Sequence, residues 1–159
     1  MTDQQNSNSS DSFRYWPIVV LRLYAGVYFT YHGFSKFSKE GFSDRMAGFL
    51  QSRLESSFGF YQGIIESVIL PNKDLFGFLV TWGELTMGIA LILGLATRYA
   101  AFAGVFMVTN IWFAKGSGLL AGTNDDLPWL MILLVLGLIH AGRYCGLDNR
   151  LSDRLRFLR

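Results

Sequence analysis

The sequence predicts an all-α integral membrane protein, a four-helix transmembrane bundle with an amphipathic helical insertion between spans 1 and 2. Hydrophobic residues make up 51% of the 159 residues and aromatic residues 16%, which is too apolar for a soluble two-domain enzyme of this length. A helix that crosses a bilayer needs about 20 mostly apolar residues, each adding about 1.5 Å. The candidate spans are the apolar segments 16–37, 75–96, 99–114 and 127–145.

The chain begins with a polar segment, residues 1–14, that has too little apolar content to fold. We therefore expect a disordered tail there, followed by one membrane domain over 15–159. The first span has aromatic residues at both ends, as membrane-interface belts do. Pro17 stands in its first turn, where the missing N–H costs nothing.

The connection between the first two spans, residues 38–73, is too long to stay without structure in a compact domain. Apolar side chains recur there every three or four positions, at Met46, Phe49, Leu50, Leu54, Phe58 and Tyr61. This spacing predicts an amphipathic helix, broken near Gly59 and Gly63, that lies on the membrane surface or caps the bundle. An ordinary capping helix without a membrane or substrate role explains the pattern equally well.

The last two spans, 99–114 and 127–145, are short for a hydrocarbon core about 30 Å thick, which allows local thinning or partial spanning. Four spans place both termini on one side of the membrane. Five arginines cluster around and after the end of the last span: Arg143, Arg150, Arg154, Arg156 and Arg159. Positive charge favours the cytoplasmic side, so we predict a multi-pass protein of the bacterial or archaeal inner membrane with cytoplasmic termini.

Charge and cysteine content exclude several functions. The formal net charge is only +2, and no basic run is interleaved with aromatic residues, which argues against nucleic-acid binding. The single cysteine, Cys145, cannot form an internal disulfide, a CxxC redox pair or a cysteine-based zinc site. Two histidines at different depths do not make a metal site, so we predict no metal. Electron transfer then needs a cofactor or a partner.

Glu84, close to the middle of the second span, is the most informative residue. A carboxyl group at that depth costs about 2.5 to 3.5 kcal/mol, so it normally has a partner or a function. Counting about 1.5 Å per residue places Glu84, His32 and Asn110 roughly 18 to 24 Å from the cytoplasmic interface, in one polar layer. Arg22, His140 and Arg143 form a second layer within roughly 10 Å of that interface.

Each of these residues also has a structural interpretation. Glu84 fits a hydrogen bond that locks helices together, His32 an interfacial packing residue, and Asn110 a contact between helices. Arg22 fits an arginine that reaches towards the near interface. About 12 Å of depth separates it from Glu84, a distance that its side chain spans only with help from helix tilt.

Three stretches carry a family resemblance: LRLYAGVYFTYHGFSKF (21–37), GELTMGIALILGLATRYAAFAGVFMVTNIWFAKG (83–116) and HAGRYCGLDNRL (140–151). The chain resembles the DoxX superfamily of small four-helix membrane proteins, and within it the DoxD-like membrane subunit of thiosulfate:quinone oxidoreductase. The run 83–98 is the most specific match. The family's motif positions here are Arg22, Gly33, Glu84, Gly88, Gly94, Thr97, Arg98, Asn110, Gly142, Arg143 and Asp148.

The resemblance implies a membrane subunit of a redox system that oxidises a reduced sulfur compound or protects against oxidants, with quinone as electron acceptor. In this hypothesis Glu84 and His32 handle protons as catalytic residues. The quinone or the anionic donor is held by Arg22, Asn110, His140 and Arg143. The expected partners are the lipid bilayer, a protein subunit or soluble redox partner, and a second copy of the chain. The alternative is a non-catalytic membrane anchor for a soluble oxidoreductase; a small transporter is disfavoured because no inverted repeat is evident.

Overall fold

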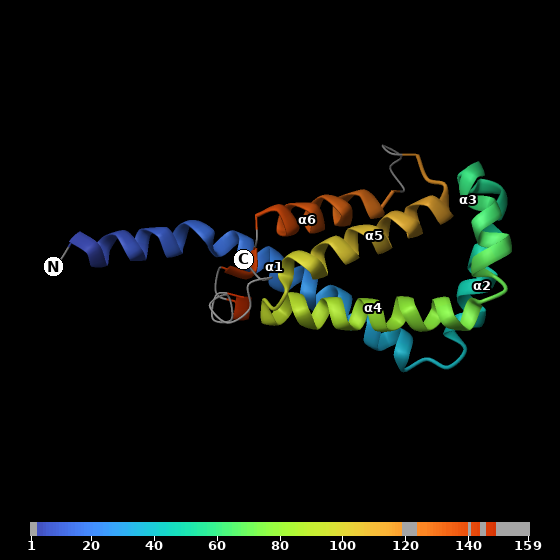
Figure 1. Ribbon diagram of the computed structural model, residues 1–159, viewed down its shortest axis with the longest axis horizontal. Coiled ribbons are helices and arrows are strands. Elements are labelled where there is room, and N and C mark those ends of the chain that lie inside the picture. The colour runs from blue at the N-terminus through green and yellow to red at the C-terminus, as the bar shows by residue number, and fades with distance from the viewer. Residues whose placement is uncertain (1–2, 119–123, 140, 144–145, 149–159) are drawn as a thin grey trace.

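The computed structural model describes residues 3–118, 124–139, 141–143 and 146–148, with side chains from Tyr15 onward except that of Arg143. Every regular element in these ranges is helical. Four helices lie side by side as a bundle (Figure 1): α1 (Asp3–Phe37), α4 (Lys73–Leu93), α5 (Thr97–Lys115) and α6 (Asp126–Leu138). The expectation of an all-helical chain is therefore confirmed.

The insertion folds as a cap across one end of this bundle (Figure 1). It contains α2 (Phe42–Arg53), a 3₁₀ turn, α3 (Gly59–Ile64) and a π-helical turn, Ile65–Ile69. The helix breaks at Ser57, whose backbone is extended, just before Gly59. The apolar stripe builds a small core of its own, in which Leu50, Tyr61 and Ile65 pack against Ala114 of α5.

The main core lies between the four long helices, where Leu91 of α4 packs among Ala25, Ala101 and Leu133. Of the described helices, one is both long and apolar enough to cross a bilayer by itself. This is α4, with a mean hydropathy of 1.7 over its most apolar 18 residues. The apolar α6 has only 13 residues. A helix of that length spans about 20 Å, which is less than the hydrocarbon core.

Two helix ends differ from the sequence-based expectation. α1 begins at Asp3, so the backbone is helical where a disordered tail was expected; propagation of an existing helix costs far less than nucleation. α6 ends at Leu138 and not at residue 145, which corrects the fourth span. The chain turns there because its next segment, a 3₁₀ turn over Ala141–Arg143, contacts α1 and α5.

Glycines let α1 and α4 approach closely. A Cβ on Gly33 would lie 2.6 Å from the backbone nitrogen of Leu85, and one on Gly26 would lie 2.7 Å from Cγ1 of Ile92. On α4, a Cβ on Gly88 would overlap the backbone nitrogen of Thr30. Glycines thus allow close backbone packing between these two helices.

This contact gives a stability prediction. Gly88→Ala is expected to destabilise the protein by about 1 to 3 kcal/mol, because the added methyl group meets backbone that cannot move aside. Gly48→Ala in α2 is the control, since a Cβ there meets nothing within 4 Å and alanine is the better helix former. Thermal unfolding in mild detergent measures both. Equal melting temperatures for the two variants would contradict the close α1–α4 contact.

Candidate functional site

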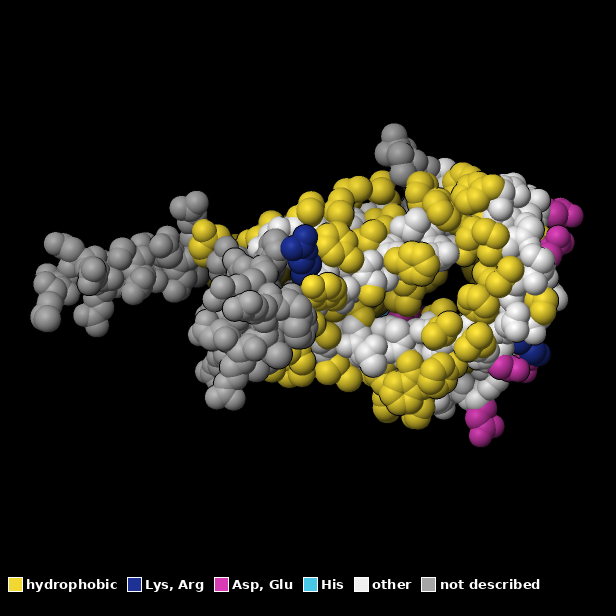
Figure 2. All heavy atoms as spheres, in the orientation of Figure 1, with side chains coloured by type: hydrophobic (Ala, Val, Ile, Leu, Met, Phe, Trp, Pro, Cys, Tyr) yellow, Lys and Arg dark blue, Asp and Glu magenta, His cyan; other side chains and the backbone are white. Residues whose placement is uncertain are grey.

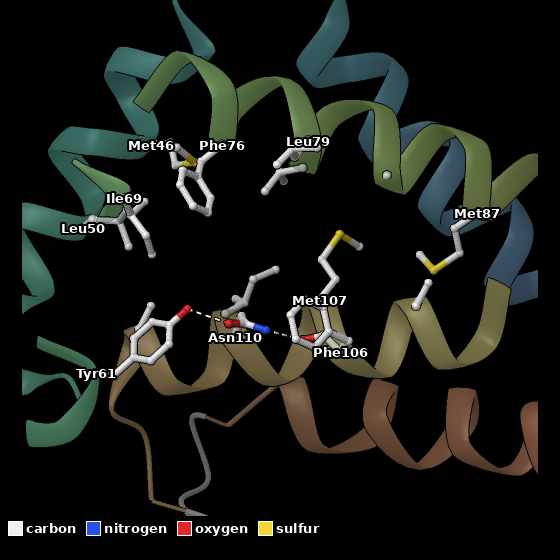
Figure 3. A pocket seen from close by; sticks show the side chains of 15 residues that line it. Met46, Leu50, Tyr61, Ile69, Phe76, Leu79, Met87, Phe106, Met107 and Asn110 are labelled. Carbon is white, nitrogen blue, oxygen red and sulfur yellow. Dashed lines mark hydrogen bonds between the residues drawn. The ribbon is translucent and has the colours of Figure 1, made fainter. Parts of the chain in front are cut away.

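A cavity of about 380 Å³ lies between α4, α5 and the cap (Figure 3). Its wall is almost entirely apolar. Three of the lining side chains are methionines, Met46, Met87 and Met107, whose flexible thioethers adapt to a ligand's shape. Two further lining residues, Leu79 and Phe106, are 52% and 72% exposed. The cavity therefore opens on the outer, apolar face of the bundle, where Figure 2 shows a hollow ringed by hydrophobic side chains.

One polar pair interrupts this apolar wall. The Tyr61 hydroxyl donates a 2.7 Å hydrogen bond to Oδ1 of Asn110, and Nδ2 of Asn110 donates a 2.7 Å bond to the Phe106 carbonyl (Figure 3). Burial raises the pKa of Tyr61, so its hydroxyl keeps its proton at neutral pH. A primary amide has two N–H groups and two oxygen lone pairs, so Asn110 retains capacity for a ligand.

Glu84 is buried in the wall next to this cavity. Its side chain is 6% exposed, and Oε1 accepts a hydrogen bond from Nζ of Lys36 near the end of α1. Among the described residues, Oε2 has no hydrogen-bond partner. Glu84 does not line the cavity, but Gly83 and Met87 of the same helix do. The carboxyl group therefore lies behind the cavity wall.

The other expected site residues lie in separate places. His32 is half-buried and packs its ring against Tyr28, with 4.3 Å between ring centroids. Asn110 faces the cavity, where it bonds Tyr61 and not Glu84. His140 lies outside the described residues, and so does the side chain of Arg143.

Arg22 is 1% exposed, and its Nη1 donates a 2.9 Å hydrogen bond to the carbonyl of Ala141. It does not pair with Glu84. It is also buried, whereas the structural interpretation expected its side chain to reach the membrane interface.

A carboxylate clamp holds the chain near Arg22, at the end of the bundle opposite the cap. Asp148 accepts hydrogen bonds from the backbone N–H groups of Ala96 (2.6 Å) and Thr97 (3.0 Å), and its own N–H donates to the Gly94 carbonyl (2.9 Å). Ala96 has a positive φ of 48°, so the clamp stabilises a strained turn at the start of α5. Three of the family's motif positions, Gly94, Thr97 and Asp148, thus meet in a contact that stabilises the fold.

Lys36 and Tyr61 are site residues that the sequence analysis missed. Lys36 lies inside the expected first span, 16–37, but was not among the candidate site residues, and Tyr61 was treated as one apolar residue of the insertion stripe. A tyrosine on an apolar stripe is the signal available for the second, because its hydroxyl needs a partner when buried.

Comparisons with known proteins identify a family. Residues 18–116 match the family model described as DoxX, which is more than half of the chain. The matched range includes the whole cavity as well as Lys36 and Glu84. A comparison with curated proteins and one with solved structures found no match. The chain belongs to the DoxX family, a membrane-associated family.

Proposed function

We propose that this protein is a small membrane subunit of a redox system and that its cavity binds a quinone, the mobile electron acceptor of the membrane. One observation carries the proposal: an apolar cavity with a single polar pair, Tyr61 and Asn110, opens on the outer face of the bundle. Ligand sites commonly combine an apolar wall with a few polar groups that fix orientation.

All four bundle helices are proposed to span the membrane. Each exposes large apolar side chains: Tyr24 of α1 is 57% exposed, Phe78 of α4 57%, Phe106 of α5 72% and Leu138 of α6 61%. Soluble monomers rarely expose contiguous apolar surface of this extent, whereas lipid tails solvate it without cost. In this arrangement the termini are cytoplasmic, the cap lies outside, and the short α6 thins the bilayer locally.

The residues present fit a quinone. The adaptable methionines suit a flat apolar ring, and a quinone carbonyl is a hydrogen-bond acceptor for the second N–H of Asn110, whose side chain the Tyr61 hydroxyl holds in place. The exposed Leu79 and Phe106 at the mouth of the cavity would let the tail of a bound quinone extend into lipid. When bound, the quinone accepts two electrons and two protons; the electrons come from a reduced compound, such as a sulfur compound, or from a redox partner. Glu84 and His32 are the titratable groups proposed to supply protons.

A variant that fills the cavity tests this function. A Cβ on Gly83 would meet only Sδ of Met107, at 3.7 Å, so Gly83→Leu fits without moving the backbone and occupies the cavity. We expect at least tenfold weaker binding of decylubiquinone and an unchanged melting temperature. Quenching of tryptophan fluorescence in proteoliposomes measures the affinity.

Asn110→Leu is the companion variant, and loss of its hydrogen bond is expected to weaken binding about tenfold. Thr109→Val is the matched control, because Thr109 bonds only its own helix, at the Val105 carbonyl, and does not line the cavity. Unchanged affinity in a folded Gly83→Leu variant would rule out this quinone site. A wild-type protein that binds no quinone but purifies with a stoichiometric redox partner would favour the membrane-anchor function instead.

A further inference from the structure

We propose that Lys36 passes protons between water and Glu84, so that the ion pair of these two residues is a proton route into the bundle. The inference rests on the proposed function, which requires protons to reach a buried site. It assigns a role to a second hollow of the molecule, on the other side of α4 from the cavity.

The second hollow is a groove of about 250 Å³ at the junction of α1, α2 and α4. Its wall includes four polar side chains: Lys36, Ser43, Asp74 and Thr81. It shares no lining residue with the cavity. Asp74 is exposed, so the groove meets the aqueous phase at the cap end of the bundle.

Lys36 and Glu84 join this groove to the interior. The lysine side chain is 24% exposed and lines the groove, whereas the glutamate side chain is 6% exposed and does not. Nζ of Lys36 donates a hydrogen bond to Oε1 of Glu84 and lies 5.5 Å from the ring centroid of Phe42, which helps to hold the ammonium at the inner end of the groove. The buried Oε2 of Glu84 has no partner among the described residues, so the inner end of the route carries acceptor capacity that the chain does not use.

The transfer balances within the pair. One proton moves from Nζ of Lys36 to Oε1 of Glu84, which leaves a neutral amine hydrogen-bonded to a neutral carboxylic acid. The pair is neutral overall before and after this step, which limits the cost of burial. The amine then takes a proton from a hydronium ion in the groove, which leaves water, and the pair carries one positive charge until Glu84 passes its proton on. Lysine can release its proton in this way, and arginine cannot, because its guanidinium stays protonated in proteins.

Other titratable groups lie around this route. His32 and Tyr28 are on α1, with 4.3 Å between their ring centroids. Asp74 lines the groove, and Asp44 of α2 pairs with Lys73 of α4. None of these groups forms a hydrogen bond with Glu84 in the described part of the chain, so only Lys36 connects the buried carboxyl group to the groove there.

Time-resolved infrared spectroscopy on the full chain in proteoliposomes tests the route without any quinone. After a rapid drop in pH, the carboxylic acid band of Glu84, identified by its loss in Glu84→Gln, reports the arrival of the proton. Lys36→Arg keeps the charge and the pair, and we expect the band to rise at least tenfold more slowly than in wild type. In Lys36→Met the acid has lost its counterion, so the band should already be present at neutral pH before the jump.

A static ion pair gives a different result. If the band rises as fast in Lys36→Arg as in wild type, the route is overturned. If Lys36→Arg does not fold, Lys36→Met with added methylamine is the second test. Methylamine is expected to restore an ionised Glu84 in this variant, and an acid band that persists would overturn the route. Decylubiquinone titration of the same samples separates the two proposals. If quinone binds and the acid band of Lys36→Arg rises as fast as in wild type, only the proton route is overturned. If no quinone binds and the band of Lys36→Arg rises slowly, only the quinone site is overturned.

Discussion

Asp148→Ala is expected to lower the free energy of unfolding by about 3 kcal/mol, which corresponds to roughly 6 to 12 °C in melting temperature. The substitution removes the acceptor of two hydrogen bonds, from the backbone N–H groups of Ala96 and Thr97. Thr97 is fully buried, so water does not replace the lost carboxylate there. Each hydrogen bond to a charged acceptor contributes about 1.5 to 3 kcal/mol.

Two variants frame this result, each measured by thermal unfolding in detergent. Asp148→Asn keeps one side-chain oxygen as acceptor and should lose about half as much stability. Asp125→Ala is the matched control, because Asp125 is exposed and its side chain makes no capping bond at the start of α6. A melting temperature for Asp148→Ala equal to that of the control would show that the clamp does not contribute to stability.

Glu84→Gln is expected to reduce quinone-dependent turnover about 100-fold while the protein still inserts and folds. Glutamine keeps the size of the side chain and can still accept a hydrogen bond from Lys36, so the free energy of unfolding should fall by only about 1 kcal/mol. What disappears is the group that can hold and release a proton. A purely structural acid would tolerate the change.

Glu66→Gln is the control for the same chemistry, since Glu66 is exposed in the cap. Quinol formation in proteoliposomes, with melting temperatures recorded in parallel, separates loss of function from loss of fold. Wild-type turnover by a well-folded Glu84→Gln protein would exclude the proton role of this residue. A bound quinone would then have to receive its protons from another group.

The sequence predicts most helix positions well because the apolar runs coincide with the helices and the helix-breaking residues coincide with their ends. The expected second span, 75–96, corresponds to α4, which ends where Gly94 adopts a left-handed conformation. The insertion is helical and capping, as the spacing of its apolar residues indicates. The last span was overestimated because the apolar run continues past Leu138, and only tertiary contacts end the helix there.

The candidate site was harder to predict. Counting residues gives depth but not direction around a helix axis, so it grouped Glu84 with His32 and Asn110 and left the place of a charged partner unfilled. Lys36 takes that place because its long flexible chain lets the ammonium reach away from its own backbone position. The cavity itself is a region where packing is missing, and no local pattern in the sequence records that. Among the expected site residues whose side chains the structure describes, Asn110 is the one that lines it.

The bond between Arg22 and the Ala141 carbonyl joins positions 119 residues apart. A chain is made from its N-terminus, so the first helix enters the membrane while its carbonyl partner is still unmade. Until that segment is translated, the Ala141 carbonyl is missing as an acceptor, and water, a lipid head group or the insertion machinery can take its place. Nascent chains that stop before Ala141 therefore lack this carbonyl acceptor for the guanidinium, and the difference gives cellular quality control a physical mark by which to distinguish unfinished molecules from finished ones.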